Sequence, residues 1–262
     1  MTPSIGSSML RTVLRRLASS VAWIVIAAPI VGCSGGTETG NPSFRFELSY
    51  TAYSSAPRVI GLRSEATEAT VSNAWLDLDT VALDRAGNCG AASSDVVLAP
   101  ALGIGDHASG NHNLTRVEVR QGAFCGLDLP FVRAHVDGIV DNVPAELAEH
   151  SIMLAGELSN GTKFSLLSSA TPTVRLVADA GSFRLDEQHA HTLIAFDVAT
   201  WLAGLDWSEA SLRAGAIFVS AEENAALLRQ FEGNLARGVA LYRDQDGDGQ
   251  LDAAPERLAH GE

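Results

Sequence analysis

The sequence predicts a mainly β fold: an antiparallel β-sandwich, as one large or two small units, with one short C-terminal helix. Short segments that alternate apolar and polar residues recur along the chain, which is the period of a half-buried strand. Turn-forming residues separate these segments at intervals of roughly ten residues, as in sandwiches and barrels. A convincing helical spacing of apolar residues occurs only once, and no internal repeat of fixed period is evident.

The clearest expected strands are Phe44–Tyr53 and Val71–Asp84, where apolar and polar residues alternate. Segments 150–158 and 162–169 predict a hairpin, because Asn160-Gly161 between them accepts the positive φ of a tight turn. Pro130 predicts an edge strand or a bulge. Further expected strands are 58–62, 95–100, 116–120, 124–138, 173–179, 181–187, 239–244 and the segment 191–207, which finishes as a helical turn around 200–205.

The expected helix spans residues 220–237. Ser220 and Glu223 have the spacing of a capping box, and the helix is expected to end at Gly238. Its apolar stripe consists of Ala225, Leu228, Phe231 and Leu235. We expect this helix to be structural, covering one edge or face of a sheet.

The first residues indicate export from the cytoplasm. Three arginines without an acidic residue precede the apolar run Val21–Gly32. That run is too short to cross a bilayer core, which needs about 20 apolar residues in a helix. A basic start followed by a short apolar core is typical of a signal peptide.

The end of this run resembles the bacterial lipobox, through Ile30-Val31-Gly32-Cys33. The resemblance implies cleavage after Gly32, a diacylglycerol on the Cys33 thiol and acylation of the new amine. More than one acyl chain is needed for stable anchoring, which this arrangement provides. Ser34 in the next position implies sorting to the outer membrane, facing the periplasm or the cell surface. The alternative is an ordinary signal peptidase site near Ala27-Ala28.

These observations divide the chain into a signal peptide at 1–32, a flexible tether at 33–43 and β domains at 44–141 and 142–262. The tether is expected because Gly, Ser, Thr, Asn and Pro dominate it. The boundary between the β domains is expected near Asp141–Pro144. One continuous domain fits the pattern nearly as well.

The charge balance limits the partners. The whole chain carries a formal charge of −13, and removing the three arginines of the signal peptide leaves about −16. An acidic surface repels nucleic acid and anionic lipid headgroups, so neither is expected as a partner. It is compatible with cation binding, and equally with a plain acidic envelope protein.

Cys89 and Cys125 remain once Cys33 is assigned to the lipid. In an oxidising compartment two such cysteines form a disulfide, whereas in the cytoplasm they would be thiols. The alternative is a pair of buried free thiols. A zinc site is disfavoured because no histidine lies near them at ligand spacing.

The strongest chemical motif is DQDGDGQLDAAPE, Asp244 to Glu256. It resembles the D-x-D-x-D-G loops of EF-hands and related calcium sites, in which alternate oxygens converge on one hard cation and Gly249 allows the sharp turn. The expected ligands are Asp244, Asp246, Asp248, Gln250 through its carbonyl, Asp252 and Glu256.

The match to an EF-hand is incomplete. Pro255 stands where the bidentate glutamate belongs, and the preceding segment is strand-like rather than helical. We therefore expect calcium to be a structural cofactor, as in single calcium-stapled loops of secreted β domains. The alternative is a solvated acidic turn.

Other chemistry is less well supported. His189 and His191 flank one residue and could share a metal, while His107 and His112 lie in a Gly- and Asn-rich loop. Asp197 is expected to bind backbone N–H groups at a helix start rather than to act as a catalytic acid. Trp75, Trp201 and Trp207 are expected in the core, with a sugar-stacking platform as the alternative. No HExxH motif, P-loop or GxGxxG motif occurs.

From Trp75 to its end, the chain loosely resembles uncharacterised bacterial envelope lipoproteins built from β-sandwich domains. The resemblance rests on the lipobox, the TETGNP tether, the Cys89/Cys125 pair and the LYRDQDGDG ending. It implies no mechanism, because that group has no assigned activity. The sequence thus favours a non-catalytic, lipid-anchored envelope protein with a structural, adhesive or assembly role and a protein or glycan partner. A calcium-dependent glycan- or peptide-binding module and a hydrolase with an unrecognised acid pair are the alternatives.

Overall fold

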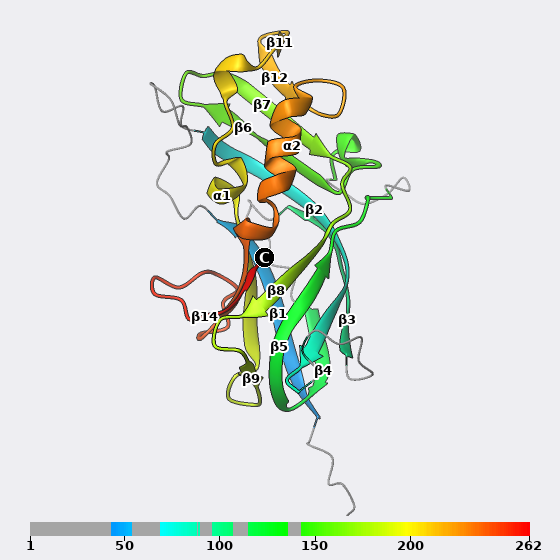
Figure 1. Ribbon diagram of the computed structural model, residues 1–262, viewed down its shortest axis with the longest axis vertical. Helices are drawn as coiled ribbons and strands as arrows, with labels where there is room; N and C mark the ends of the chain where they lie inside the picture. The colour runs from blue at the N-terminus through cyan, green and yellow to red at the C-terminus, as the bar shows by residue number, and fades with distance from the viewer. Residues whose placement is uncertain (1–42, 54–68, 88, 90–95, 107–114, 136–142) are drawn as a thin grey trace, which may run out of the picture. The chain divides into compact units, whose positions relative to one another are not determined.

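The computed structural model describes residues 43–53, 69–87, 89, 96–106, 115–135 and 143–262 (Figure 1). Within these residues, strands dominate. They are β1 Ser43–Tyr53, β2 Ala69–Arg85, β3 Val96–Asp106, β4 Thr115–Arg120, β5 Gly122–Pro130, β6 Ile152–Leu158, β7 Lys163–Ser168, β8 Thr173–Ala178, β9 Phe183–Leu185, β10 His191–Asp197, β11 Leu212–Arg213, β12 Ala216–Val219, β13 Val239–Arg243 and β14 Arg257–Gly261. The helices are α1 Val198–Leu202 and α2 Ala225–Asn234, with 3-10 turns η1 Ala145–Leu147, η2 Trp207–Glu209 and η3 Ala236–Gly238.

The described strands join in one mixed sheet. Its main path runs β11-β12-β7-β6-β2-β5-β8-β14-β13-β10-β1-β4, with β3 paired to β2 and β9 to β5. Most pairs are antiparallel, but β1 runs parallel to β10 and β12 runs parallel to β7. The predicted mainly β, sandwich-like fold with a short helix is confirmed, and the two parallel pairs make the sheet mixed rather than wholly antiparallel.

Strand β2 is the centre of this arrangement. It spans 17 residues and pairs with β3, β5 and β6 along different parts of its length. Its register shifts between Val71 and Asn73, between Thr80 and Val81, and between Asp84 and Arg85. Because bulges bend a strand and increase its twist, one long strand can serve several partners.

Strands from both sides of the expected boundary near Asp141–Pro144 share this sheet. Both β5 and β6 pair with β2, and the described residues belong to one compact unit. The expected hairpin is present as β6 and β7, with Gly161 at φ 82° in the turn. Pro130 ends β5, which lies between β2 and β8, so the proline marks the end of an interior strand and not an edge.

The apolar residues of alternate positions form one core. On β2, β6 and β7 they include Leu76, Leu154 and Leu166, each fully buried. Helix α2 packs on β7 and β12 and contributes Phe231 to the same cluster (Figure 1). This confirms a structural role for the helix as the cover of one sheet face.

Helix α2 begins five residues later than the expected start at 220. Asn224 precedes it in the left-handed conformation, with φ 56°, and its side-chain amide donates to the carbonyl oxygens of Ser211 and Phe218. Ser220 and Glu223 instead close a separate turn, in which the Glu223 N–H donates to Ser220 Oγ at 3.2 Å. Long-range contacts of Asn224 therefore set the start of the helix.

Three further expectations concern individual side chains. Asp197 caps α1 by accepting a hydrogen bond from the Ala199 N–H at 3.1 Å, as expected. Trp201 and Trp207 are buried in the core while Trp75 is half-buried, so the alternative of a three-tryptophan sugar platform is wrong. Among the described residues, no helix is long and apolar enough to cross a membrane.

The predicted disulfide is present. Cys89, which follows β2, is bonded to Cys125 on β5, with 6.0 Å between their Cα atoms. Cys125 is buried and Cys89 is exposed. The bond therefore joins the turn after β2 to the neighbouring strand.

Candidate metal centre

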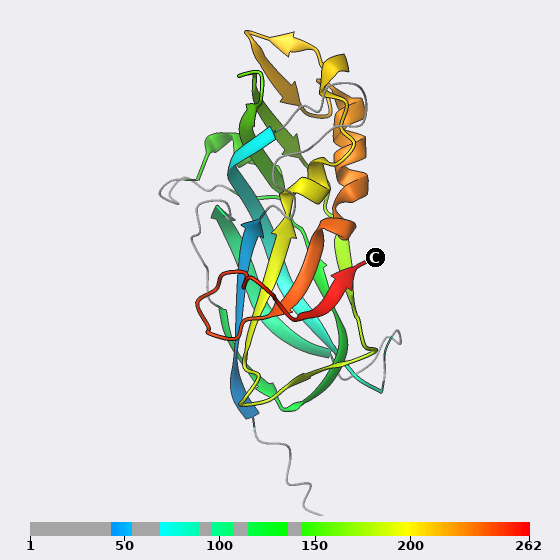
Figure 2. The ribbon, with the colours of Figure 1, turned by 90° about the vertical axis from the view of Figure 1, so that its left-hand side faces the viewer.

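The acidic loop connects β13 to β14. Figure 2 shows it as a red-brown excursion between the last two strands. Its first residue is tied to the sheet, because the Asp244 N–H donates to the His191 carbonyl oxygen at 3.3 Å. Gly247 and Gly249 both have φ 73°, a conformation that glycine adopts without a Cβ clash. The two glycines thus allow the chain to turn twice within the motif.

Three carboxylates of the motif converge. Asp244, Asp246 and Asp248 each offer an oxygen atom, and these atoms all lie within 4.8 Å of one another. Asp244 is 4% exposed, whereas Asp246 and Asp248 are exposed. Oxygen atoms at this spacing, some buried and some open to solvent, fit a hard cation that keeps part of its water shell.

The loop holds its carboxylates by its own backbone. Asp244 accepts hydrogen bonds from the N–H groups of Gly247 at 2.9 Å and Gly249 at 3.0 Å, one on each oxygen. Asp248 accepts from the Gln250 N–H at 2.7 Å, and Asp246 accepts from the Asp248 N–H at 3.3 Å. Each carboxylate therefore has a fixed orientation and retains lone pairs for a further partner.

The electrostatics of Asp244 favour a positive partner. Its burial raises the pKa of this carboxyl, and the charges of Asp248 and Asp246 raise the pKa further. The N–H groups of Gly249 and Gly247 act in the opposite direction without cancelling the shift. A cation between the three carboxylates would favour the ionised form and remove the repulsion.

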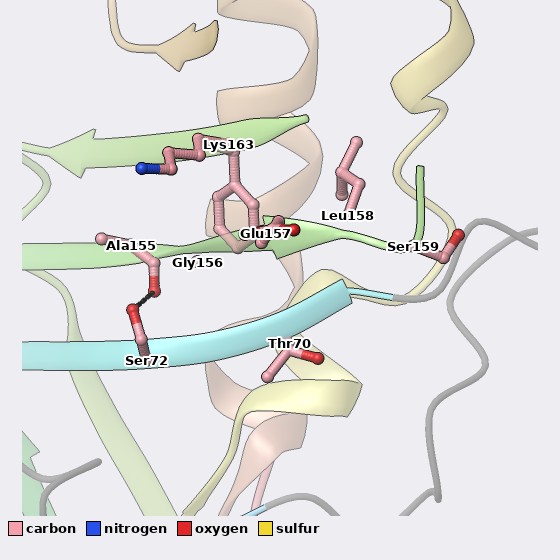
Figure 3. A pocket seen from close by; sticks show the side chains of 9 residues that line it. Thr70, Ser72, Ala155, Gly156, Glu157, Leu158, Ser159 and Lys163 are labelled. Carbon is pink, nitrogen blue, oxygen red and sulfur yellow. Dashed lines mark hydrogen bonds between the residues drawn. The ribbon is translucent and has the colours of Figure 1, made fainter. Parts of the chain in front are cut away.

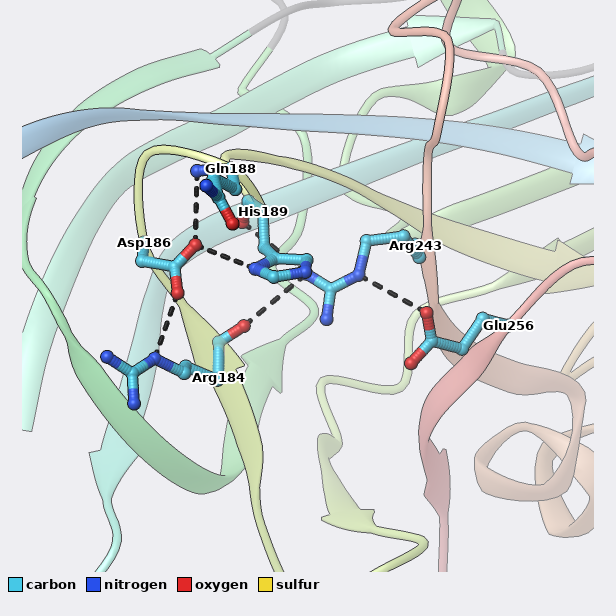
Figure 4. A network of polar contacts seen from close by, with 6 residues as sticks. All are labelled: Arg184, Asp186, Gln188, His189, Arg243 and Glu256. Carbon is cyan, nitrogen blue, oxygen red and sulfur yellow. Dashed lines mark hydrogen bonds and ion pairs between the residues drawn. The ribbon is translucent and has the colours of Figure 1, made fainter.

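The remaining expected ligands lie outside this trio. Gln250 is exposed and Asp252 is half-buried. The carboxylate of Asp252 does not belong to the cluster of converging oxygen atoms, which consists of Asp244, Asp246 and Asp248. The Glu256 carboxylate faces Arg243 Nε at 3.5 Å (Figure 4). The structure therefore brings together Asp244, Asp246 and Asp248, and places Glu256 in an ion pair.

Arg243 is the residue that sequence reasoning missed. It is 9% exposed, and its Nη1 donates to the carbonyl oxygens of Arg184 and His189, both at 3.4 Å (Figure 4). It thus links the end of β13, immediately before the acidic loop, to β9 and to the connection between β9 and β10. An arginine directly before the acidic motif was the only sequence signal for this role.

The histidine pair has other partners. His189 Nδ1 lies 2.7 Å from Asp186 Oδ1, and Arg184 Nε binds the second oxygen of Asp186 at 2.9 Å (Figure 4). The His191 ring instead lies against Gly247 of the acidic loop. Within the described residues, the two histidines are not part of a three-ligand cluster. Cys33, His107 and His112 lie outside the described residues.

A cavity of about 700 Å³ lies on β2, β6 and β7 (Figure 3). Ser72 and Thr70 line it from β2, with Glu157 and Lys163 from the hairpin. Ser72 Oγ donates to the Ala155 carbonyl oxygen at 3.2 Å. Among the described residues that line it, Glu157 is the only acid, so they do not supply the two carboxylates that an acid-pair hydrolase uses.

Comparison with protein-family models finds no match, and comparison with curated proteins finds no relative. Among solved structures, the chain is similar to MbnP from Methylosinus trichosporium, at 14% sequence identity and a TM-score of 0.42. The alignment covers 84% of this chain and 99% of that one. A likeness this distant carries no information about function.

Proposed function

We propose that this chain is a non-catalytic, lipid-anchored protein of the cell envelope, with a structural calcium site in the loop between β13 and β14. The observation that carries the metal site is the convergence of Asp244, Asp246 and Asp248 on a loop folded by two glycines of positive φ. The lipid anchor rests on the lipobox-like sequence that ends at Cys33.

Calcium is the cation that this donor set favours. Ca²⁺ accepts six to eight oxygen ligands in flexible geometry, whereas Mg²⁺ demands a near-ideal octahedron. The three aspartates would supply carboxylate oxygens, the Gln250 backbone its carbonyl, and water the remaining positions. Asp252 is close enough in sequence to act through a water molecule, as the ninth position of such loops often does.

The role of the ion is stabilisation. The loop leaves β13 at Arg243 and returns through Glu256, and these two residues form the ion pair described above. Their backbones are also joined, since the Arg243 N–H donates to the Glu256 carbonyl oxygen at 2.8 Å. An ion bound in the loop between Arg243 and Glu256 would fix both ends of the loop and support the pairing of β13 with β14.

Calcium titration of the purified protein by calorimetry and thermal unfolding tests this site. We expect saturable binding and a higher melting temperature with Ca²⁺, reversed by a chelator. Asp246→Asn/Asp248→Asn should abolish both effects. Glu187→Gln/Glu209→Gln, which removes the same charge at exposed positions elsewhere, should leave them intact. An equal response of the two double variants would refute a specific site.

The anchor has an independent test. Intact-mass analysis of protein extracted from native membranes should show cleavage after Gly32 and the added mass of acyl chains on Cys33. Cys33→Ser should move the protein from the membrane fraction to the soluble fraction. Retention of that variant in the membrane fraction contradicts the lipid anchor and leaves the calcium site unaffected. In the envelope, the anchored body would present its surface to a protein or glycan partner.

A further inference from the structure

A second cavity, of about 440 Å³, lies beside helix α2 and away from the acidic loop. One wall is α2, from Ala225 to Glu232, with the residues that precede the helix, and the other is the end of β7. Arg133, which follows β5, and His150, which precedes β6, complete the lining. The volume is within the usual range of small-molecule sites.

The floor of this cavity is apolar and its rim is charged. Leu228 of α2 is 7% exposed, and Leu167 and Ala225 are half-buried beside it. Around them stand the basic side chains of Arg133 and Arg229 and the acidic side chains of Glu222 and Glu232. Two opposite pairs of charges therefore surround a surface that an apolar group can cover.

The two acids are held in place by serines. Glu232 Oε1 accepts a hydrogen bond from the buried Ser168 hydroxyl at 2.7 Å, and Glu222 Oε2 accepts from the Ser220 hydroxyl at 2.8 Å. The Ser220 hydroxyl lowers the pKa of Glu222, and the nearby His150 lowers it further. In each carboxylate, the second oxygen has no side-chain partner among the described residues.

The two arginines keep donors for a ligand. Arg229 makes no ion pair and no side-chain hydrogen bond with any described residue. Arg133 uses Nε to donate to the Ser169 carbonyl oxygen at 3.0 Å, which orients its guanidinium and leaves the terminal nitrogens. A guanidinium with free donors binds a carboxylate through two parallel hydrogen bonds.

A ligand for this cavity must satisfy both kinds of charge. A simple anion would meet two carboxylates and a protein of net charge −13, and a simple cation would meet two guanidinium groups. A molecule with a carboxylate, an ammonium group and a small apolar portion between them matches the rim and the floor together. The free ends of a short peptide have this chemistry.

We propose that the cavity between α2 and the end of β7 binds a short zwitterionic peptide. Its carboxylate is bound by Arg229 and Arg133, its ammonium group by Glu222 and Glu232, and its apolar side chains lie on Leu228, Leu167 and Ala225. This site is separate from the proposed calcium loop and does not depend on it.

The test uses four forms of one dipeptide: L-alanyl-L-alanine, its N-acetyl form, its C-terminal amide and the form blocked at both ends. Binding to the purified full chain is followed by chemical-shift changes and calorimetry, with calcium present throughout. We expect the free dipeptide to bind at least tenfold more tightly than the doubly blocked form. Each singly blocked form should fall between them, because each keeps one charged contact.

Variants assign each end of the peptide. Arg229→Gln should remove the advantage of a free carboxylate and keep that of a free amine, and Glu222→Gln should do the reverse. Lys163→Gln, on the other cavity, is the control and should change neither. Arg229, Glu222 and Lys163 are exposed, so these variants should fold, which circular dichroism confirms.

The outcomes that overturn the proposal are distinct from those that concern calcium. Equal affinity for the free and doubly blocked dipeptides would refute recognition of the termini. If the residues that line the cavity beside α2 show no chemical-shift changes in a saturating titration, the site is refuted. Either result leaves the calcium titration and its double variant unaffected.

Discussion

The indole nitrogen of Trp201 donates a hydrogen bond to the backbone carbonyl of Leu235 at 2.9 Å. The contact joins α1 to the turn that follows α2. Asn234 completes it, since its side-chain amide donates to the carbonyl oxygens of Trp201 at 3.1 Å and Ala203 at 2.9 Å. Two of these three hydrogen bonds are buried and the third is partly buried, so this connection is sensitive to small changes of shape.

Gly238→Ala should destabilise the protein. A Cβ at this position would collide with the Trp201 indole and lie 3.0 Å from the Asp197 carbonyl oxygen. Overpacking of this kind costs about 1–3 kcal/mol, measured by urea unfolding.

Gly233→Ala is the matched control, because its Cβ would meet nothing within 4 Å. That variant lies within α2 and should gain about 0.5–1 kcal/mol from helix propensity. Equal effects of the two substitutions would contradict the packing described here.

Arg175→Met should destabilise the sheet by leaving two carboxylates without their cation. Arg175 on β8 binds Asp84 on β2 and, at 2.8 Å, Asp128 on β5. The Asp84 side chain is 13% exposed and that of Arg175 is 31% exposed, so solvent screens the cluster only in part. We expect a loss of about 1–3 kcal/mol in urea unfolding. Adding Asp84→Asn and Asp128→Asn should recover part of it, and a fully additive loss would show that charge is not the cause.

Cleavage of the Cys89–Cys125 disulfide should lower stability mainly through the unfolded chain. The bond closes a loop with a sequence separation of 36 residues. On the chain-entropy model such a loop contributes about 3–4 kcal/mol. Cys89→Ser/Cys125→Ser should lose this amount in urea unfolding under oxidising conditions. Under reducing conditions the unfolding free energy of the wild-type protein should fall to that of the variant. A difference in unfolding free energy that persists under these conditions would contradict a stabilising role of the disulfide.

The fold could be predicted where neighbouring residues determine it. Alternation of apolar and polar residues located β1, β2 and the β6–β7 hairpin, and Gly161 marked its turn. The parallel pairing of β1 with β10 could not be predicted, because it joins Leu48 to Thr192 across most of the described chain. The start of α2 depends on contacts of Asn224 with Ser211 and Phe218, which a local capping pattern does not contain.

The same limit applies to the candidate site. The spacing of Asp244, Asp246 and Asp248 predicted their convergence, because a short loop with glycines at fixed positions determines it. The position of Glu256 depends on Arg243, which is oriented by one carbonyl oxygen of β9 and one of the connection from β9 to β10. The sequence contains no sign of that neighbourhood, so it could not separate an ion-pair role from a metal ligand.

Asp248→Asn should have opposite effects with and without calcium. In a chelator, the wild-type loop keeps three carboxylates within 4.8 Å, and removing one charge relieves repulsion. Because Asp248 is exposed, we expect a gain of a few tenths to about 1 kcal/mol. Asparagine retains an oxygen that can accept the Gln250 N–H. In excess calcium the variant should be less stable than the wild type, and thermal unfolding under both conditions measures the crossover. Lower stability in both conditions would contradict a repulsive metal-free loop.

Asp77→Asn should raise stability at neutral pH and lose this advantage in acid. Asp77 is 8% exposed on β2, and its burial raises the pKa of its carboxyl. The charge of Asp79 acts in the same direction, against the Leu78 N–H and His135. A carboxyl with a raised folded pKa binds its proton more tightly in the folded state. Its ionisation therefore lowers wild-type stability as the pH rises from 3.8, the ordinary pKa of an aspartate carboxyl, through the raised pKa of the folded state.

The neutral amide of asparagine removes this dependence. The difference in unfolding free energy between Asp77→Asn and wild type, from urea titrations at several pH values, should be largest at pH values above the raised pKa. It should shrink as the pH falls toward the usual range of a carboxyl, near pH 4, because Asp77 becomes neutral in both states. Glu187→Gln, at an exposed position, is the control and should show no such trend. A difference independent of pH would mean that the ionisation of Asp77 does not weaken the fold.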